Sequence, residues 1–140
     1  DLDMNTVEPA IGAHRMDKVY AWKSMLDMGI HTSGGSDAPV VSFDAMENIY
    51  FAVTRKNISG QPQEGWIPSE KMSVDEAVKL FTKNAAYASY TEKENGTIET
   101  GKNADLVVLE KDIYSIDPDE IKTVKVDMTV LGGKVVFERE

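Results

Sequence analysis

Apolar residues recur every three or four positions over residues 14–28, which predicts an amphipathic helix. Gly29 follows this stretch at the position where a left-handed helix cap is favoured. Next comes a short apolar run, residues 30–33, which we interpret as a strand fed by the helix. A helix leading into a short strand is typical of α/β folds.

A second helix is predicted from Ala45 to about Arg55. Asp44 precedes it and can accept hydrogen bonds from the free amides of the first turn, while Glu47 can reach back to the cap amide. The buried face of this helix is expected to consist of Met46, Ile49, Tyr50 and Val53. The Gly- and Pro-rich residues 57–68 then predict a long loop.

The third helix carries the clearest start signal in the chain. Ser73 is followed three residues later by Glu76, the spacing of a capping box, and an apolar pattern continues to about Lys83. A further turn or two is expected from Asn84 through a run of small residues.

The last part of the chain changes from helical spacing to alternation. Residues 104–109 predict a buried strand, and residues 123–131 alternate apolar with polar positions. Gly132-Gly133 is expected to close a two-residue hairpin into a final strand, residues 134–138. Between them, Asp117-Pro118 predicts a helical turn with proline in its first position. Residues 94–140 therefore form a small β unit, separate from the helical residues 1–93.

Composition narrows the possible functions. The net charge is −9, from 24 acidic and 15 basic residues, which argues against a nucleic-acid partner. The chain has no cysteine, so disulfides and thiolate metal sites are excluded. No apolar stretch is long enough to span a membrane and no signal peptide is visible, so we expect a cytoplasmic protein that binds neither membrane nor nucleic acid.

The candidate for chemistry is Asp37, in the segment Ser33-Gly34-Gly35-Ser36-Asp37-Ala38-Pro39. Glycines and a proline predict that the strand ends here in a tight loop. A carboxylate at the carboxyl end of a strand occupies the place where α/β barrels hold their catalytic groups. The alternative is that Asp37 only turns the chain, because aspartate commonly bonds to its own backbone in turns.

Three segments in this order resemble one protein family. They are Gly29-Ile30 through Gly35-Ser36-Asp37-Ala38-Pro39, then Ala52-Val53-Thr54-Arg55-Lys56, and then Gly96-Thr97-Ile98-Glu99-Thr100-Gly101-Lys102-Asn103-Ala104-Asp105-Leu106-Val107-Val108-Leu109. Together they resemble the C-terminal part of metal-dependent amidohydrolases. More narrowly they resemble amidohydrolase family 3, the branch that includes enzymes similar to N-substituted formamide deformylase. The resemblance covers about residues 15–137.

The resemblance implies a fold and an activity. The fold is a (β/α)8 barrel with an appended β-sandwich, and 140 residues are too few for a complete barrel. We therefore expect residues 1–93 to be the last helix–strand–helix units of the barrel and residues 94–140 to be the C-terminal strands of the sandwich. The implied activity is hydrolysis of a non-peptide C–N bond in a small amide by a metal-activated water, the metal being a divalent cation of the zinc type.

The same resemblance assigns roles to individual residues. Asp37 matches the aspartate that contacts the metal and takes a proton from its bound water, so it is the expected metal ligand and catalytic base. Asp105 matches a turn residue of the sandwich, and Arg15 an arginine that leads a barrel helix and is structural or contacts substrate. The histidine ligands of the family lie upstream, and His14 and His31 are neither paired nor spaced as ligands.

Two expectations follow for the chain itself. If it is the C-terminal part of a hydrolase, these 140 residues alone should bind metal weakly and hydrolyse nothing. The alternative is a non-catalytic binding or assembly module, a homo-oligomer joined through exposed strand edges. A third option is a small acidic domain whose Gly-Ser-Asp loop holds a cation through oxygen ligands alone.

Overall fold

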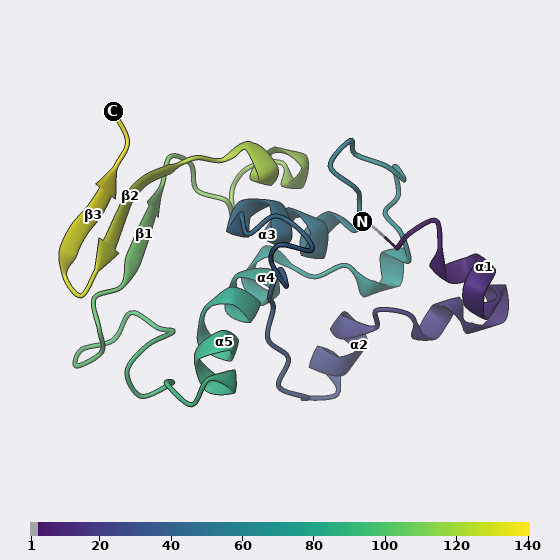
Figure 1. The fold of residues 1–140 in the computed structure, drawn as a ribbon, viewed down its shortest axis with the longest axis horizontal. Helices are drawn as coiled ribbons and strands as arrows, with labels where there is room; N and C mark the ends of the chain where they lie inside the picture. Colours follow the sequence, from purple (N-terminus) through teal and green to yellow (C-terminus); the bar gives the residue numbers. More distant parts are fainter. Residues whose placement is uncertain (1–2) are drawn as a thin grey trace.

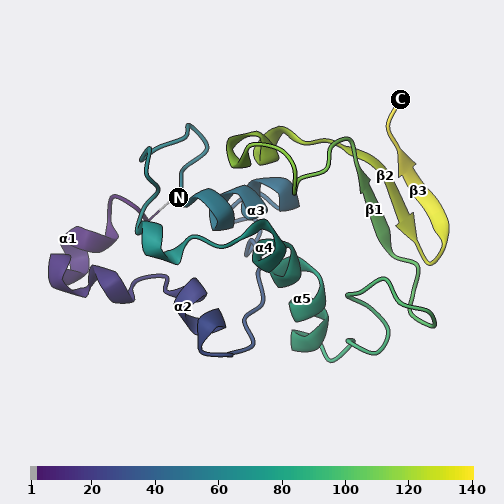
Figure 2. The ribbon, with the colours of Figure 1, turned by 180° about the vertical axis from the view of Figure 1, so that it is seen from behind.

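The computed structural model describes residues 3–140, with helical segments in the middle of the molecule and one small sheet at the C-terminal end (Figure 1). Seen from behind, the helices within residues 45–88 lie between the sheet and the N-terminal helices (Figure 2). The elements in chain order are α1 (Val7–Ile11), η1 (Ala13–Lys18), α2 (Trp22–Asp27), α3 (Ala45–Thr54), η2 (Pro68–Glu70), α4 (Val74–Phe81), α5 (Lys83–Ala88), β1 (Leu106–Leu109), η3 (Pro118–Thr123), β2 (Val126–Leu131) and β3 (Lys134–Glu138), where η marks a 3-10 helix.

The single helix predicted for residues 14–28 is wrong, because the chain forms η1 and α2 with a break between them. Tyr20 has a left-handed φ of 48°, which interrupts the helical ladder. Its ring packs against Trp22 and Trp66, with centroids 5.0 and 5.6 Å away, so tertiary contacts outweigh the local helical spacing. The expected cap after this stretch is confirmed by Gly29, whose φ is 76°.

The strand predicted at residues 30–33 is not formed. These residues run as irregular chain, and no other segment of residues 3–140 pairs with them as a strand. A strand exists only through hydrogen bonds to a neighbour, and the apolar run alone cannot supply one. The amide of Gly34 instead donates to the carbonyl of Leu80 at 3.0 Å, which fastens the segment to α4.

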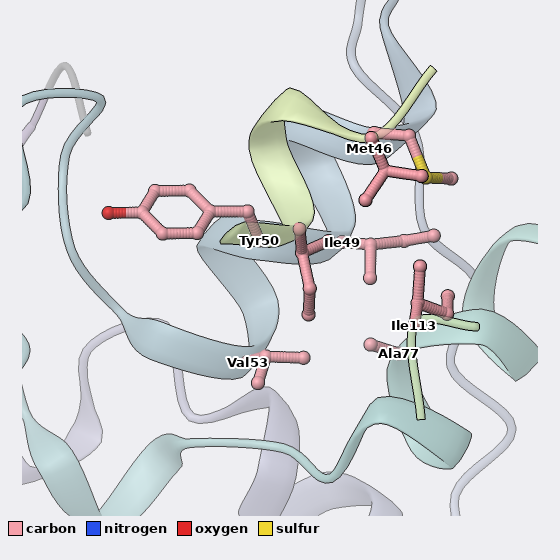
Figure 3. Packing of buried hydrophobic residues seen from close by; sticks show 8 residues of the cluster. Met46, Ile49, Tyr50, Val53, Ala77 and Ile113 are labelled. Atoms are coloured by element: carbon pink, nitrogen blue, oxygen red, sulfur yellow. The ribbon is translucent and has the colours of Figure 1, made fainter. Parts of the chain in front are cut away.

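Helix α3 forms as predicted and organises the core. The Asp44 carboxylate accepts the Met46 amide at 2.8 Å, whereas the expected return contact from Glu47 is absent because the Asp44 amide donates to the Ser42 hydroxyl at 3.1 Å. All four residues of the expected inner face are buried. Figure 3 shows this face packed against α4 and the segment after β1. The core cluster consists of Met46, Ile49, Tyr50, Val53, Ala77, Ile113, Ile121 and Val124.

Helix α4 begins with the predicted capping box. The Glu76 amide donates to the Ser73 hydroxyl at 3.2 Å, and the Ser73 amide donates to the Glu76 carboxylate at 2.8 Å. The helix ends at Phe81, and the expected short continuation is α5. No helix within residues 3–140 is long and apolar enough to cross a membrane.

The three C-terminal strands form one antiparallel sheet in the order β1-β2-β3, joined by the predicted hairpin at Gly132-Gly133. The mixed helix and strand content is as expected, but β1 is not the buried strand that its apolar run predicts. Val107 and Val108 are 57% and 47% exposed. No element of residues 3–140 covers them, and an apolar run records only which residues favour burial.

Candidate functional site

Asp37 lies where the sequence predicts a loop, on a tight turn between the irregular residues 30–36 and α3. Its φ of 52° is in the left-handed region, and its carbonyl accepts the Val40 amide at 2.9 Å. The side chain is exposed. Within residues 3–140 no hydrogen bond or ion pair engages its carboxylate, so its oxygens are available to an outside group.

The segment leading to Asp37 is attached to α4 and α5 by hydrogen bonds. The Asn84 side chain donates to the Thr32 carbonyl at 2.9 Å. A Cβ added at Gly34 would lie 2.8 Å from Cζ of Phe81, so the ring would have to shift to admit a larger residue than glycine. These contacts give the Asp37 loop a fixed base although it contains no regular secondary structure.

Each of the two histidines contacts a neighbouring side chain other than Asp37. His31 is exposed, and its ring stacks on Tyr87 with centroids 4.2 Å apart. His14 accepts a hydrogen bond from Nε of Arg15 at 3.1 Å, and both side chains are exposed.

A complete metal site does not fit the described residues. Nowhere in residues 3–140 do three or more histidine, cysteine, aspartate or glutamate side chains converge as ligands. A zinc site needs three or four protein ligands, and Asp37 supplies one carboxylate. Any metal at Asp37 would therefore need ligands from outside this part of the chain.

A cavity of about 360 Å³ opens beside the Asp37 loop. The loop contributes lining residues that precede and follow Asp37 in the sequence: Gly34, Gly35, Val40 and Val41. Asp37 itself does not line the cavity. Aromatic rings and α3 form the rest of the wall. The floor includes Arg55, the residue that ends α3.

Sequence reasoning named Arg55 only as part of a motif and missed its position. It is 6% exposed, with a left-handed φ of 58°. Its Nε donates to the Trp66 carbonyl at 3.1 Å, and its guanidinium carbon lies 5.6 and 5.4 Å from the ring centroids of Trp22 and Trp66. Burial lowers the pKa of Arg55, and the nearby Glu70 carboxylate opposes this shift. No signal in the sequence places this arginine, because the two tryptophan rings approach it from separate segments of the chain.

Glu70 is the second buried charge near the cavity and is fully occupied. It accepts the Ser24 amide at 3.0 Å and also the Ser24 hydroxyl. Burial raises the pKa of Glu70, but these hydrogen bonds lower it by more than burial raises it, so the net shift is downward. Glu70 therefore fixes α2 against η2 as a carboxylate.

Asp105 lies at the hairpin, far along the chain from the loop. Its carboxylate accepts the Gly132 amide at 2.7 Å and so ties the β2–β3 turn to the start of β1. This contact agrees with the expected turn role of Asp105.

Comparisons with known proteins agree with one another. A family described as the amidohydrolase family matches residues 1–137. The chain is 37% identical over 137 residues to YtcJ of Bacillus subtilis, covering 98% of this chain and 26% of YtcJ. It is 36% identical over 122 residues to N-substituted formamide deformylase of Arthrobacter pascens, covering 87% of this chain and 22% of that protein.

A solved structure gives the same picture for the fold. The crystal structure of an amidohydrolase from Thermotoga maritima superposes with a TM-score of 0.60 at 24% identity, covering 83% of this chain and 25% of that chain. The chain thus spans about a quarter of the length of the relatives it matches.

Proposed function

Because the chain belongs to the amidohydrolase family, we propose that it is the C-terminal part of a metal-dependent hydrolase that cleaves the C–N bond of a small non-peptide amide. The match over residues 1–137 is the observation that carries this proposal. The name of the Arthrobacter relative, a deformylase of N-substituted formamides, supports the choice of bond. The cytoplasm remains the expected location.

We further propose that residues 1–93 complete a (β/α)8 barrel and residues 94–140 complete a β-sandwich. The succession of helix, loop and helix around Asp37 supports the first assignment. The β-sandwich assignment is supported by the antiparallel sheet of β1, β2 and β3, whose apolar side chains are exposed.

Within that enzyme, Asp37 is the proposed metal ligand and general base. A divalent cation of the zinc type, held there together with further ligands, would supply a water of lowered pKa. The exposed Asp37 carboxylate, free of partners within residues 3–140, would be one of the ligands and would hold the proton that passes to a leaving amine. The remaining metal ligands would come from outside residues 3–140.

The first test uses the 140-residue chain alone. Zinc titration should give weak binding, and amide substrates should not be hydrolysed, because one carboxylate is too few ligands for a site. Tight stoichiometric zinc binding or turnover would contradict the proposal that most of the site lies elsewhere.

The second test joins the chain to an upstream barrel. In a chimera, this chain replaces the matching C-terminal segment of the Arthrobacter deformylase, and hydrolysis of an N-substituted formamide is measured. Asp37→Asn should lower kcat by a factor of about 10² to 10⁴, as expected for loss of a general base. Asp44→Asn is the control and should retain activity, since asparagine caps a helix as well as aspartate does. Equal loss in both variants would refute the role of Asp37.

A second candidate function is a non-catalytic assembly module. Strand β3 is exposed at all five residues and forms an edge of the sheet. Lys134 and Glu138 stand at its two ends, so antiparallel pairing of two copies would place opposite charges together. Sedimentation velocity decides between the candidates: a dimer that dissociates on Val136→Lys favours assembly, and a compact monomer argues against it.

A further inference from the structure

The buried guanidinium of Arg55 has more donors than acceptors. Nε is bonded to the Trp66 carbonyl, and Nη1 has one long contact of 3.5 Å with the Tyr20 carbonyl. Nη2 is buried and has no hydrogen-bond partner within residues 3–140. A charged donor group taken out of water without an acceptor is costly, so such a group favours the arrival of an anion.

No acid among the described residues neutralises Arg55 directly. Glu70 acts on it at longer range and spends its oxygens on Ser24. Asp3 also lines the cavity, but its carboxylate accepts the hydrogen bond of the Tyr20 hydroxyl. Lys56, the other cation of the cavity wall, is paired with Asp119 at 2.7 Å. Among the cations of the cavity wall within residues 3–140, Arg55 is therefore the one with a hydrogen-bond donor left without an acceptor.

We propose that the cavity beside the Asp37 loop binds a small organic carboxylate, with Arg55 as the anchor of the carboxylate group. A planar guanidinium matches the two oxygens of a carboxylate in a fork-like pair. The volume of about 360 Å³ is in the range of small-molecule sites.

The side chains of the cavity wall indicate which chemical group is attached to the carboxylate. Trp22, Phe51, Trp66 and Phe81 contribute aromatic surface, which favours a flat apolar group attached to the carboxylate. Because the site lies on residues present in this chain, binding does not depend on the catalytic role proposed for Asp37. Failure of one proposal therefore leaves the other intact.

The experiment uses phenylacetate and its neutral analogue phenylacetamide as probes of the unmodified chain. The chain has two tryptophans, Trp22 and Trp66, and both line the cavity, so tryptophan fluorescence reports on this site. Phenylacetate should bind about tenfold more tightly than phenylacetamide or better, as expected when a charged hydrogen-bonded pair is formed. Equal binding of the two probes, or no saturable signal from phenylacetate at millimolar concentration, overturns the proposal.

Variants assign the effect to one side chain. Arg55→Gln should weaken phenylacetate binding about tenfold or more, and Arg55→Lys should lie between it and the unmodified chain because lysine keeps the charge but loses the fork. Lys111→Gln is the control, since Lys111 does not line the cavity and is paired with Glu120 at 2.8 Å, and should change binding by less than about twofold. Unchanged binding in Arg55→Gln, with an unchanged circular dichroism spectrum, overturns the assignment. The acid–amide comparison stands even if that variant fails to fold.

Discussion

The helical region around α3 and the three-stranded sheet contain similar apolar residues but bury them very differently. Ile49 and Tyr50 of α3 are 4% and 0% exposed, whereas Val136 and Phe137 of β3 are 59% and 49% exposed. Residues from α4, η3 and the segment after β1 cover α3, and none of residues 3–140 covers β3 in the same way. The helical region thus holds its own stabilising contacts, while the sheet leaves apolar side chains exposed.

The largest loss of stability is expected from a substitution at Ile121, which is fully buried against α3. Ile121→Ala leaves a cavity in a packed core and should lower the free energy of unfolding by about 2–5 kcal/mol. Val136→Ala is the matched change on the sheet and should cost at most about 0.5 kcal/mol. Urea denaturation followed by circular dichroism measures both. Similar losses in the two variants would mean that the sheet is as tightly packed as the helical region.

A smaller effect is expected where the Asp37 loop meets the helical region. Gly34→Ala places a Cβ against the Phe81 ring and should cost about 1–3 kcal/mol through overpacking. Gly35→Ala is the control, because nothing lies within 4 Å of its added Cβ. It should leave stability unchanged or raise it by about 0.4–1 kcal/mol through the unfolded state. Thermal unfolding of the two variants tests whether the loop shares the order of the core.

The start of α4 tests how much a local signal contributes within the helical region. Ser73→Ala removes the hydroxyl of the capping box and should lower the free energy of unfolding by about 1 kcal/mol. Ser59→Ala, in the exposed loop after α3, should change it by at most about 0.5 kcal/mol. Chemical denaturation distinguishes them, and equal values would show that the cap is dispensable.

The smallest expected effect is a pH dependence at the same helix end. Burial raises the pKa of Glu76, but hydrogen bonds from Ser73 and the charge of Lys23 lower it more, so the folded pKa lies below the ordinary value of 4.5. A lowered folded pKa gives stability that is present above pH 4.5 and is lost as the pH falls further. The stability difference between the unmodified chain and Glu76→Gln should therefore shrink on acidification. A difference that is constant from neutral to acidic pH would contradict this.

Local signals in the sequence were sufficient for much of the fold. The capping box at Ser73 and the alternation before Gly132 depend on neighbouring residues, and the structure confirms both. The helix over residues 14–28 and the strand at residues 30–33 were wrong, because each depends on distant partners: the aromatic contacts of Tyr20 and an adjacent strand. The exposure of β1 was unpredictable for the same reason, since burial is a property of the whole assembly.

The candidate site was predicted only in part. Asp37 was found because glycine and proline mark a loop around it, and its role stays a prediction. The buried Arg55 could not be placed from the sequence, because Trp22 and Trp66 approach it from separate segments. Spacing along the chain does not reveal which side chains meet across it.

The close approach of Gly34 to Phe81 also constrains how the chain could have diverged. A side chain at position 34 costs less once the ring at position 81 has been replaced by a smaller group, because the added atom would otherwise lie 2.8 Å from that ring. The less costly order of substitutions is therefore Phe81→Leu first and Gly34→Ala second. Among related sequences, alanine at position 34 should accordingly be rare wherever phenylalanine is kept at position 81.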